Sequence, residues 1–205
     1  MLEGIHKIHL IGIGGSGMRA IANILIQKGY EVSGSDVKES DVIERFRQMG
    51  ATVHIGHNAD YVQGVDAVVR STAIREDNPE IVAAKEQGIT ILHRSDIVKA
   101  VLDVTNGIAV AGAHGKTSTT SMIGQILVEG QMEPTVIIGG EVDYLKGSSC
   151  LGKGEYSVVE ADESDGSFLK LRPKTIVITN IEDDHMDHYK TMENLLNAFC
   201  QFVET

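Results

Sequence analysis

Short apolar runs alternate along the chain with segments whose apolar residues recur at helical spacing. Residues 7–13 form the first predicted strand, and residues 16–28 follow as a helix with apolar positions at Met18, Ile21 and Leu25. The same alternation predicts strands at 31–35, 52–55, 67–70 and 90–92, and helices at 41–49, 79–86 and 95–102. Such a series of strand–helix–strand units predicts a parallel sheet covered on both faces.

The pattern breaks near residues 103–106 and then resumes. Strands are predicted at 107–111, 135–138, 156–160 and 175–179, with helices at 116–129 and 192–203. We therefore expect an α/β protein of two domains. Residues 1–104 would form a Rossmann-like parallel-sheet domain, and residues 105–205 a partial α/β ATPase domain of the P-loop type with no obvious end.

Charge and composition narrow the classes of partner. The formal net charge is -11, aromatic residues make up 4% and Trp is absent. A polyanion would be repelled and few rings are available for base stacking, so we expect no nucleic-acid partner. No run approaches the roughly 18 apolar residues of a membrane span. Cys150 and Cys200 form no CxxC pair, which favours a reducing, cytoplasmic location over a disulfide framework or a zinc site.

The first glycine-rich segment, residues 12–17 (GIGGSG), follows a predicted strand and opens a helix. This G-x-G-x-x-G pattern allows a tight turn and brings a pyrophosphate close to free N–H groups at the helix N-terminus. Asp36 closes the next strand, where it could meet a ribose hydroxyl. NAD or any other nucleoside diphosphate would fit this pattern, and a glycine-rich turn without a ligand is the structural alternative.

A second glycine-rich segment, residues 112–117 (GAHGKT), also joins a strand to a helix. It ends as a P-loop does, but the first glycine of G-x-x-x-x-G-K-[ST] would fall at Val110, so the loop is a variant. Lys116 would neutralise phosphate oxygens and Thr117 would offer a hydroxyl to Mg²⁺.

Acidic residues follow two of the later predicted strands. Residues 160–163 (EADE) come after one strand, and residues 180–188 (NIEDDHMDH) come after another. The carboxyl edge of a parallel sheet is where P-loop proteins hold their metal, so we expect a cation site there. Two alternatives are open: charges at helix N-termini with a surface His185, or a metallohydrolase dyad in D-H-x-D-H.

These segments together resemble the Mur ligase family. The motifs in chain order are GIGGSGM (12–18), GSD (34–36), STAI (71–74), NPE (78–80), AGAHGKTSTT (111–120), EADESDGSFL (160–169) and TNIEDDHMDHY (179–189). They are similar to successive signatures of the L-alanine-adding member, over about residues 7–203. The nearest alternative is the member that recycles a murein tripeptide, and Gly15 and Ser164 favour the L-alanine enzyme over it.

The resemblance implies an ATP- and Mg²⁺-dependent ligase of peptidoglycan precursor synthesis. ATP would phosphorylate the lactyl carboxylate of UDP-N-acetylmuramate, and the amine of L-alanine would displace phosphate from the acyl phosphate. Because Mur ligases have three domains, the resemblance covers the first and part of the second. We expect the C-terminal domain to be absent from these 205 residues and the chain to be inactive alone.

The resemblance also assigns residues. The catalytic residues would be Lys116, Glu160 and His185, and the Mg²⁺ ligands Thr117, Glu160 and His185. ATP would lie on Gly112, His114, Gly115, Lys116, Thr117 and Ser118. UDP-N-acetylmuramate would lie on Gly14, Gly15, Ser16, Gly17, Asp36, His57 and Ser71.

Two hypotheses from other classes compete with a ligase. An NAD-dependent oxidoreductase would use the first glycine loop and Asp36, but it leaves Lys116 and the acidic strand ends without a role. A non-catalytic module that senses a UDP-sugar would fit the short chain.

Overall fold

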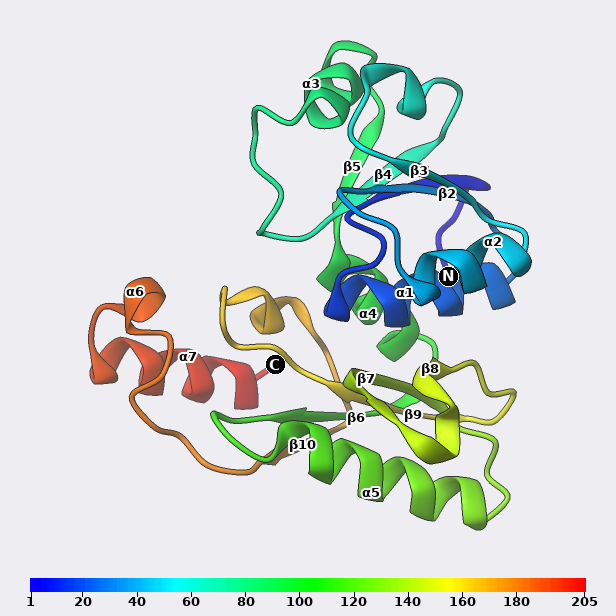
Figure 1. Cartoon of the computed structure of the whole chain (residues 1–205). Helices are drawn as coiled ribbons and strands as arrows, with labels where there is room; N and C mark the ends of the chain where they lie inside the picture. The colour runs from blue at the N-terminus through cyan, green and yellow to red at the C-terminus, as the bar shows by residue number, and fades with distance from the viewer. The chain divides into compact units, whose positions relative to one another are not determined.

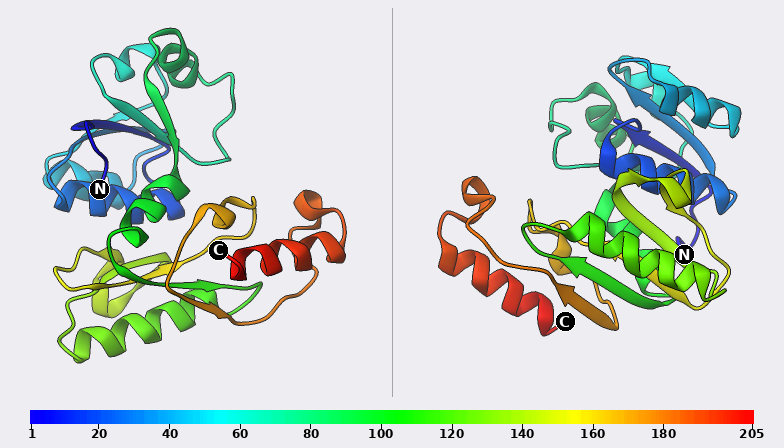
Figure 2. Two further views of the ribbon diagram at one scale, coloured as in Figure 1. Left: turned by 180° about the vertical axis from the view of Figure 1, so that it is seen from behind. Right: turned by 60° about the horizontal axis from the view of Figure 1, so that its bottom comes forward.

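The computed structural model describes residues 1–205 as two compact units, Leu2–Ile97 and Val98–Thr205, with Met1 assigned to the second. Each unit contains a five-stranded sheet with helices packed on it (Figures 1 and 2). The predicted α/β class is confirmed. The chain passes from one unit to the other within helix α4 (Arg94–Leu102), while a domain boundary between residues 104 and 105 stays a prediction.

The first sheet is entirely parallel. Its strands are β1 (Lys7–Ile11), β2 (Glu31–Asp36), β3 (Thr52–Ile55), β4 (Ala67–Arg70) and β5 (Thr90–His93), in the order β3-β2-β1-β4-β5. The chain leaves β1 toward β2 on one side and returns to β4 on the other. The carboxyl end of β1 is therefore a switch point, the position where open α/β sheets bind ligands.

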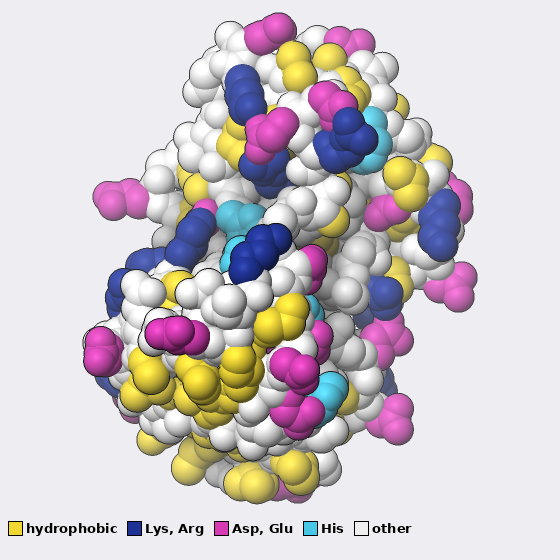
Figure 3. All heavy atoms as spheres, turned by 90° about the vertical axis from the view of Figure 1, so that its left-hand side faces the viewer, with side chains coloured by type: hydrophobic (Ala, Val, Ile, Leu, Met, Phe, Trp, Pro, Cys, Tyr) yellow, Lys and Arg dark blue, Asp and Glu magenta, His cyan; other side chains and the backbone are white.

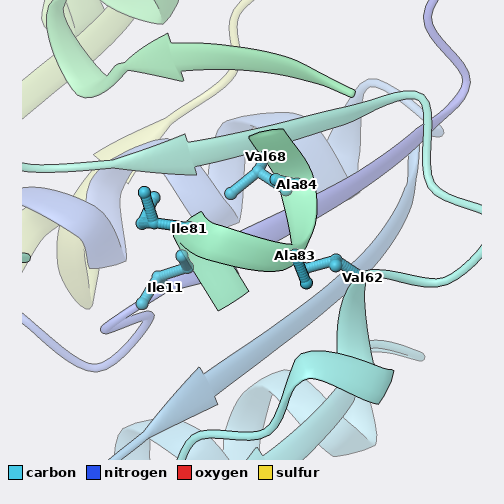
Figure 4. Packing of buried hydrophobic residues seen from close by; sticks show 6 residues of the cluster. All are labelled: Ile11, Val62, Val68, Ile81, Ala83 and Ala84. Carbon is cyan, nitrogen blue, oxygen red and sulfur yellow. The ribbon is translucent and has the colours of Figure 1, made fainter. Parts of the chain in front are cut away.

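Helices α1 (Ser16–Gln27), α2 (Asp41–Gln48) and α3 (Pro79–Glu86), with the 3₁₀ turn η1 (Ala59–Val62), connect these strands. Helix α3 begins with proline, and the side chain of Asn78 accepts the Glu80 N–H, so the start of the helix is well defined. Ile81 of α3 packs in a fully apolar cluster with residues of β1, β4 and η1 (Figure 4). This packing holds the first turn of α3 against the sheet.

The second sheet is mixed. Its strands are β6 (Asn106–Ala111), β7 (Thr135–Val142), β8 (Gly147–Cys150), β9 (Tyr156–Glu160) and β10 (Thr175–Ile178), in the order β10-β6-β9-β7-β8. Only β8 runs antiparallel to its neighbour, β7. Helix α5 (Lys116–Glu129) follows β6, and β6 lies between β10 and β9. The ends of β10 and β9 therefore flank the loop that enters α5.

The last part of the chain forms the short helix α6 (Met186–Tyr189) and helix α7 (Met192–Val203), after the turns η2 (Asp143–Leu145) and η3 (Ser167–Lys170). Phe168 of η3 contacts the rings of Phe199 and Phe202, which attaches α7 to the unit. A patch of apolar side chains is visible in the lower half of Figure 3, and α7 exposes Met192, Leu196 and Val203. No helix is long and apolar enough to cross a membrane.

All the predicted strands and long helices are present, with ends shifted by a few residues. The first strand ends at Ile11 because Gly12 turns the chain with φ +72°. Two strands differ from the prediction: β7 continues through Gly139 and Gly140 to Val142, and β8 was not predicted. The short helix α6 and the 3₁₀ turns were not predicted either. The β8 sequence, GSSC, carries no alternation of apolar and polar residues that would mark a strand.

Candidate functional site

The first glycine loop lies at the carboxyl end of β1, as predicted. The N–H groups of Gly12 and Ile13 both donate to the Ser35 carbonyl at the end of β2, at 2.8 and 3.0 Å. The loop is therefore fastened to the neighbouring strand before α1 begins. Gly15 precedes α1 without a side-chain cap, so N–H groups of the first turn face the loop. This is the arrangement that binds an anionic group.

Asp36 lies directly against this loop. Its Oδ2 accepts the Gly14 N–H at 2.8 Å, and its Oδ1 accepts the Val37 N–H at 2.7 Å. A Cβ on Gly14 would come within 2.9 Å of Asp36 Oδ2, so glycine is required for this close approach. The sequence placed Asp36 near a ribose, and the structure shows that it also shapes the loop.

Two arginines lie beside the loop, and the sequence analysis did not single out either. Arg19 Nε donates to the Gly14 carbonyl at 3.0 Å. Arg94, the first residue of α4, has its Nη1 3.0 Å from the position of a Cβ on Gly17. Both cations could neutralise a diphosphate at the loop.

His57 and Ser71 follow β3 and β4, at the same sheet edge. His57 Nδ1 lies 2.9 Å from Glu80 Oε1, and Glu80 also binds His9 and Ser35. The predicted first-unit residues therefore gather at the carboxyl ends of consecutive strands. Glu80 and His9, which the sequence analysis did not assign to the site, lie beneath them.

The second glycine loop needs its glycines for conformation and for space. Gly112 has φ +131°, and a Cβ there would lie 2.3 Å from Thr179 Oγ1. Gly115 caps α5 in the left-handed region with φ +80°. The residues after β10 hold the loop from the side: the His114 N–H donates to Asn180 Oδ1 at 2.9 Å, and Thr179 Oγ1 donates to the His114 carbonyl at 2.6 Å.

Lys116 and Thr117, the first residues of α5, each meet a carboxylate. Lys116 Nζ lies 2.7 Å from Glu163 Oε1, with side chains exposed by 15% and 2%. Thr117 Oγ1 donates to Glu160, whose two oxygens are each 3.1 Å away, and Glu160 Oε2 also accepts the Gly139 N–H at 2.8 Å. The loop cation and the loop hydroxyl are thus both oriented by acids at the end of β9.

His185 lies near Glu163. Its Nε2 is 3.7 Å from Glu163 Oε1 and 3.6 Å from Asp184 Oδ2. His185 itself has φ +56°, an uncommon conformation for a residue other than glycine, which is often found at functional positions. A metal shared by Glu160 and His185 stays a prediction, because no group of three or more His, Cys, Asp or Glu side chains is arranged to hold an ion.

The remaining predicted residues of the nucleotide loop are at the surface. His114 Nε2 lies 3.6 Å from Glu182 Oε2, and both side chains are more than half exposed. Ser118 is exposed in the first turn of α5. Both are accessible to a ligand of the loop.

Glu163 is the main residue of this site that sequence reasoning did not assign. Its Oε2 is buried without a hydrogen-bond partner, while Tyr189 donates its hydroxyl to the Glu163 carbonyl. Burial, together with the nearby charges of Glu163, Asp165 and Asp162, raises the pKa of Tyr189 to about 12, so this hydroxyl stays protonated. Lys116 and His185 both face the other oxygen, Oε1, so Oε2 of Glu163 is a buried acceptor without a donor.

The fold and these two loops define a class: an α/β protein of two units, each with a glycine-rich loop between a strand and a helix. The comparisons with known proteins give the particular family. Residues 7–104 match the model for the Mur ligase family, catalytic domain, and residues 110–205 match the model for the Mur ligase middle domain. The chain belongs to the Mur ligase family.

Curated relatives agree with this assignment. The chain is 52% identical over 199 residues to the UDP-N-acetylmuramate–L-alanine ligase of Desulforamulus reducens, covering 96% of this chain and 43% of that protein. It is 49% identical to the ligase of the same name from Desulfatibacillum aliphaticivorans, covering 97% and 44%. The chain thus spans less than half the length of the curated relatives it matches.

Solved structures show the same fold. The UDP-N-acetylmuramate–alanine ligase of Thermotoga maritima superposes with a TM-score of 0.90 at 34% identity, over 97% of this chain and 47% of that one. The UDP-N-acetylmuramate:L-alanyl-gamma-D-glutamyl-meso-diaminopimelate ligase of Neisseria meningitides also gives 0.90, at 28% identity, over 98% and 68%.

Proposed function

We propose that this chain provides the UDP-sugar site and the phosphate-binding loop of an ATP-dependent ligase that joins L-alanine to UDP-N-acetylmuramate in peptidoglycan precursor synthesis. The carrying observation is that one chain holds two glycine-rich strand-to-helix loops of different construction. The loop after β1 has the G-x-G-x-x-G pattern suited to a diphosphate, and the loop after β6 has the lysine suited to a transferable phosphate.

L-alanine is favoured over a murein peptide as the second substrate. The curated relatives at 49 and 52% identity carry the L-alanine name, while the murein peptide ligase structure is 28% identical. Gly15 and Ser164, which favour the L-alanine enzyme by motif, point the same way.

The proposed reaction has two displacement steps. An oxygen of the lactyl carboxylate attacks the γ-phosphorus of ATP, ADP leaves, and an acyl phosphate forms. The amine of L-alanine then attacks the acyl carbon, phosphate leaves with the bonding electrons, and the amine loses its proton. Neither step needs a covalent bond to the protein, so the protein contributes positioning and charge neutralisation.

Lys116 and Thr117 would act on the phosphates. Lys116 is held at the loop by the Gly112 and Ala113 carbonyls as well as by Glu163, so its charge is already at the loop when a nucleotide arrives. The N–H groups at the start of α5 add donors for the same oxygens. His185, beside Glu163, is the proposed ligand of a second cation or a donor to the acyl phosphate.

The donors at the end of β9 fit Mg²⁺. Thr117 and Glu160 supply hard oxygen ligands side by side, and Mg²⁺ commonly binds one or two carboxylates together with substrate phosphates and water. The absence of a cluster of three acidic or histidine side chains is consistent with an ion that needs the nucleotide for its other ligands. When bound, Mg²⁺ would withdraw charge from the phosphate oxygens.

An oxidoreductase is less well supported. It would use the first loop and Asp36, and the Lys116–Glu163 and Thr117–Glu160 pairs would have no role. A sensor of UDP-sugars would use the first unit alone. We place the ligase in the cytoplasm, a reducing compartment compatible with the two free cysteines.

Calorimetric titration tests the proposal. We expect residues 1–205 to bind UDP-N-acetylmuramate and not NAD, and to bind Mg-ATP with an affinity that Lys116→Ala lowers at least tenfold. Lys153→Ala, which removes an exposed lysine elsewhere in the second unit, is the matched control. Tight NAD binding with no response to UDP-N-acetylmuramate would overturn the proposal.

A further inference from the structure

A buried carboxylate joins two histidines and a serine beneath the carboxyl edge of the first sheet. Glu80, in the first turn of α3, is fully buried. Its Oε2 lies 3.0 Å from His9 Nε2 and accepts the Ser35 hydroxyl at 2.7 Å. Its Oε1 lies 2.9 Å from His57 Nδ1 and accepts the Asn58 N–H at 3.3 Å.

This carboxylate is ionised despite its burial. Loss of solvent by itself would raise the pKa of Glu80, but hydrogen bonds from His9, Ser35 and His57 outweigh that effect and lower it. An ionised group without solvent is costly unless it is fully hydrogen-bonded, and here each oxygen has two partners.

Of the four side chains of Glu80, His9, Ser35 and His57, only that of His57 is accessible. The side chains of His9 and Glu80 have no exposed area, whereas the His57 side chain is 22% exposed. His57 follows β3, at the same carboxyl edge as the glycine loop, and Ser35 also binds the loop through its carbonyl. Glu80 is therefore linked to the loop on one side and to an accessible imidazole on the other.

The contact with Glu80 determines which ring nitrogen of His57 carries the proton. An ionised carboxylate can only accept, so the proton between Glu80 Oε1 and His57 Nδ1 belongs to His57. In a neutral imidazole, Nε2 then carries a lone pair and accepts hydrogen bonds. Such a nitrogen matches a hydroxyl or an N–H of a ligand and does not match a phosphate oxygen.

We propose that Glu80 is a positioning residue that holds His57 in the Nδ1–H tautomer, so that His57 Nε2 accepts a hydrogen bond from a donor on the nucleoside of the bound UDP-sugar. The inference rests on the proposed function of the first unit as a UDP-sugar site. The donors on that nucleoside are the 2′ and 3′ hydroxyls of the ribose and the uracil N3–H. Glu80 itself does not touch the ligand.

The tautomer is measured directly by ¹⁵N–¹H correlation spectra of the histidine side chains, assigned by His57→Gln. We expect the Nδ1–H form for His57 in the wild-type protein and its loss in Glu80→Gln, while Glu76→Gln, an exposed acid just before α3, leaves it unchanged. A wild-type His57 in the Nε2–H form would overturn the inference whether or not the Glu80 variant folds.

Binding provides the second readout. Glu80→Gln and His57→Ala should each weaken UDP-N-acetylmuramate binding about tenfold, the double variant should lose no more than either single variant, and Mg-ATP binding should be unchanged. Titration of UDP, 2′-deoxy-UDP, 3′-deoxy-UDP and N3-methyl-UDP identifies the donor, because the matching analogue loses affinity in the wild type but not in His57→Ala.

The outcomes separate the two proposals. If the losses of UDP-N-acetylmuramate affinity in Glu80→Gln and His57→Ala add up in the double variant, or if Glu80→Gln binds unchanged, the proposed role of Glu80 is wrong. Neither result would contradict the UDP-sugar site itself. A wild-type protein that binds no UDP-N-acetylmuramate would overturn the proposed function and this inference with it.

Discussion

At the residue scale, the Lys116–Glu163 pair shows how the lysine after the second glycine loop is held in place. The lysine is mostly buried, and Glu163 has almost no exposed surface. Its second oxygen lacks a partner, so Lys116 carries most of the compensation for a buried charge. The contact that holds Lys116 at the loop therefore also makes the stability of the folded state depend on Lys116.

We predict that Lys116→Ala lowers the free energy of unfolding by about 3 kcal/mol in the absence of nucleotide, because it leaves a buried carboxylate unpaired. The double variant Lys116→Ala/Glu163→Gln should recover most of that loss. Urea unfolding of the four proteins of this cycle measures it, with Lys153→Ala expected to stay within about 0.5 kcal/mol of wild type. Additive losses in the double variant would contradict the pairing.

A second prediction concerns the stability of the protein at acidic pH. Because the folded-state pKa of Glu80 is lowered from its ordinary value of 4.5, its contribution to stability is present above that pH and is lost as pH falls through the folded pKa. Glu80→Gln should therefore flatten the fall in stability below about pH 4.5.

Glu76 is the matched comparison for this acid effect. Hydrogen bonds from Lys85 and Arg70 also lower the pKa of Glu76, but its side chain is 62% exposed. Salt should screen the Glu76 contribution and leave that of Glu80 nearly unchanged. Unfolding followed between pH 3 and 6 at two salt concentrations distinguishes them, and equal salt dependence would contradict the buried role.

At the element scale, α3 matters because it carries Glu80. The helix is held by Ile81, which is fully buried against β1, β4 and η1 (Figure 4). Ile81→Ala should lower the free energy of unfolding by about 2–5 kcal/mol through the cavity it leaves. The neighbouring Val82→Ala, at a position 40% exposed, should cost about 0.5 kcal/mol or less. Chemical denaturation provides the comparison, and similar losses for both would show that this cluster does not hold α3.

Local patterns predicted most of these elements. Apolar periodicity and the glycines after β1 and β6 were enough to predict two α/β units and their loops, because each signal is contained within a few neighbouring residues. Strand β8 was not predicted because its polar sequence has no strand pattern of its own. It forms a strand only through its pairing with β7. An antiparallel partner of that kind is a tertiary effect without a local signal.

The site was predicted less completely than the fold. Lys116, Thr117 and Glu160 come together as the motifs indicated, although their roles stay predictions. Glu163 stood within a quoted motif, but the direction of its side chain depends on the turn after β9. His9 offered a usable signal: a histidine inside an otherwise apolar strand requires a buried partner, and that partner is Glu80.

At the scale of the whole molecule, the chain covers 43–44% of the first curated relatives, so binding and turnover need not go together. We predict that a polypeptide of residues 1–205 binds UDP-N-acetylmuramate but shows no L-alanine-dependent release of phosphate from ATP. Domain closure that expels water and brings an amine to an acyl phosphate is a common requirement of such chemistry. Turnover that needs L-alanine and disappears in Lys116→Ala would contradict the prediction.

The contact between the second glycine loop and the residues after β10 has a consequence for the order of folding. All five strands of the first sheet are complete once the ribosome has made His93, so that unit can fold early. The phosphate loop at 112–115 is different, because Thr179 and Asn180 supply the groups that hold Ala113 and His114. Translation proceeds at about 5–20 residues per second, so several seconds pass between the synthesis of the loop and that of the residues that hold it. During that interval the proposed UDP-sugar site would be complete and the proposed ATP site would not.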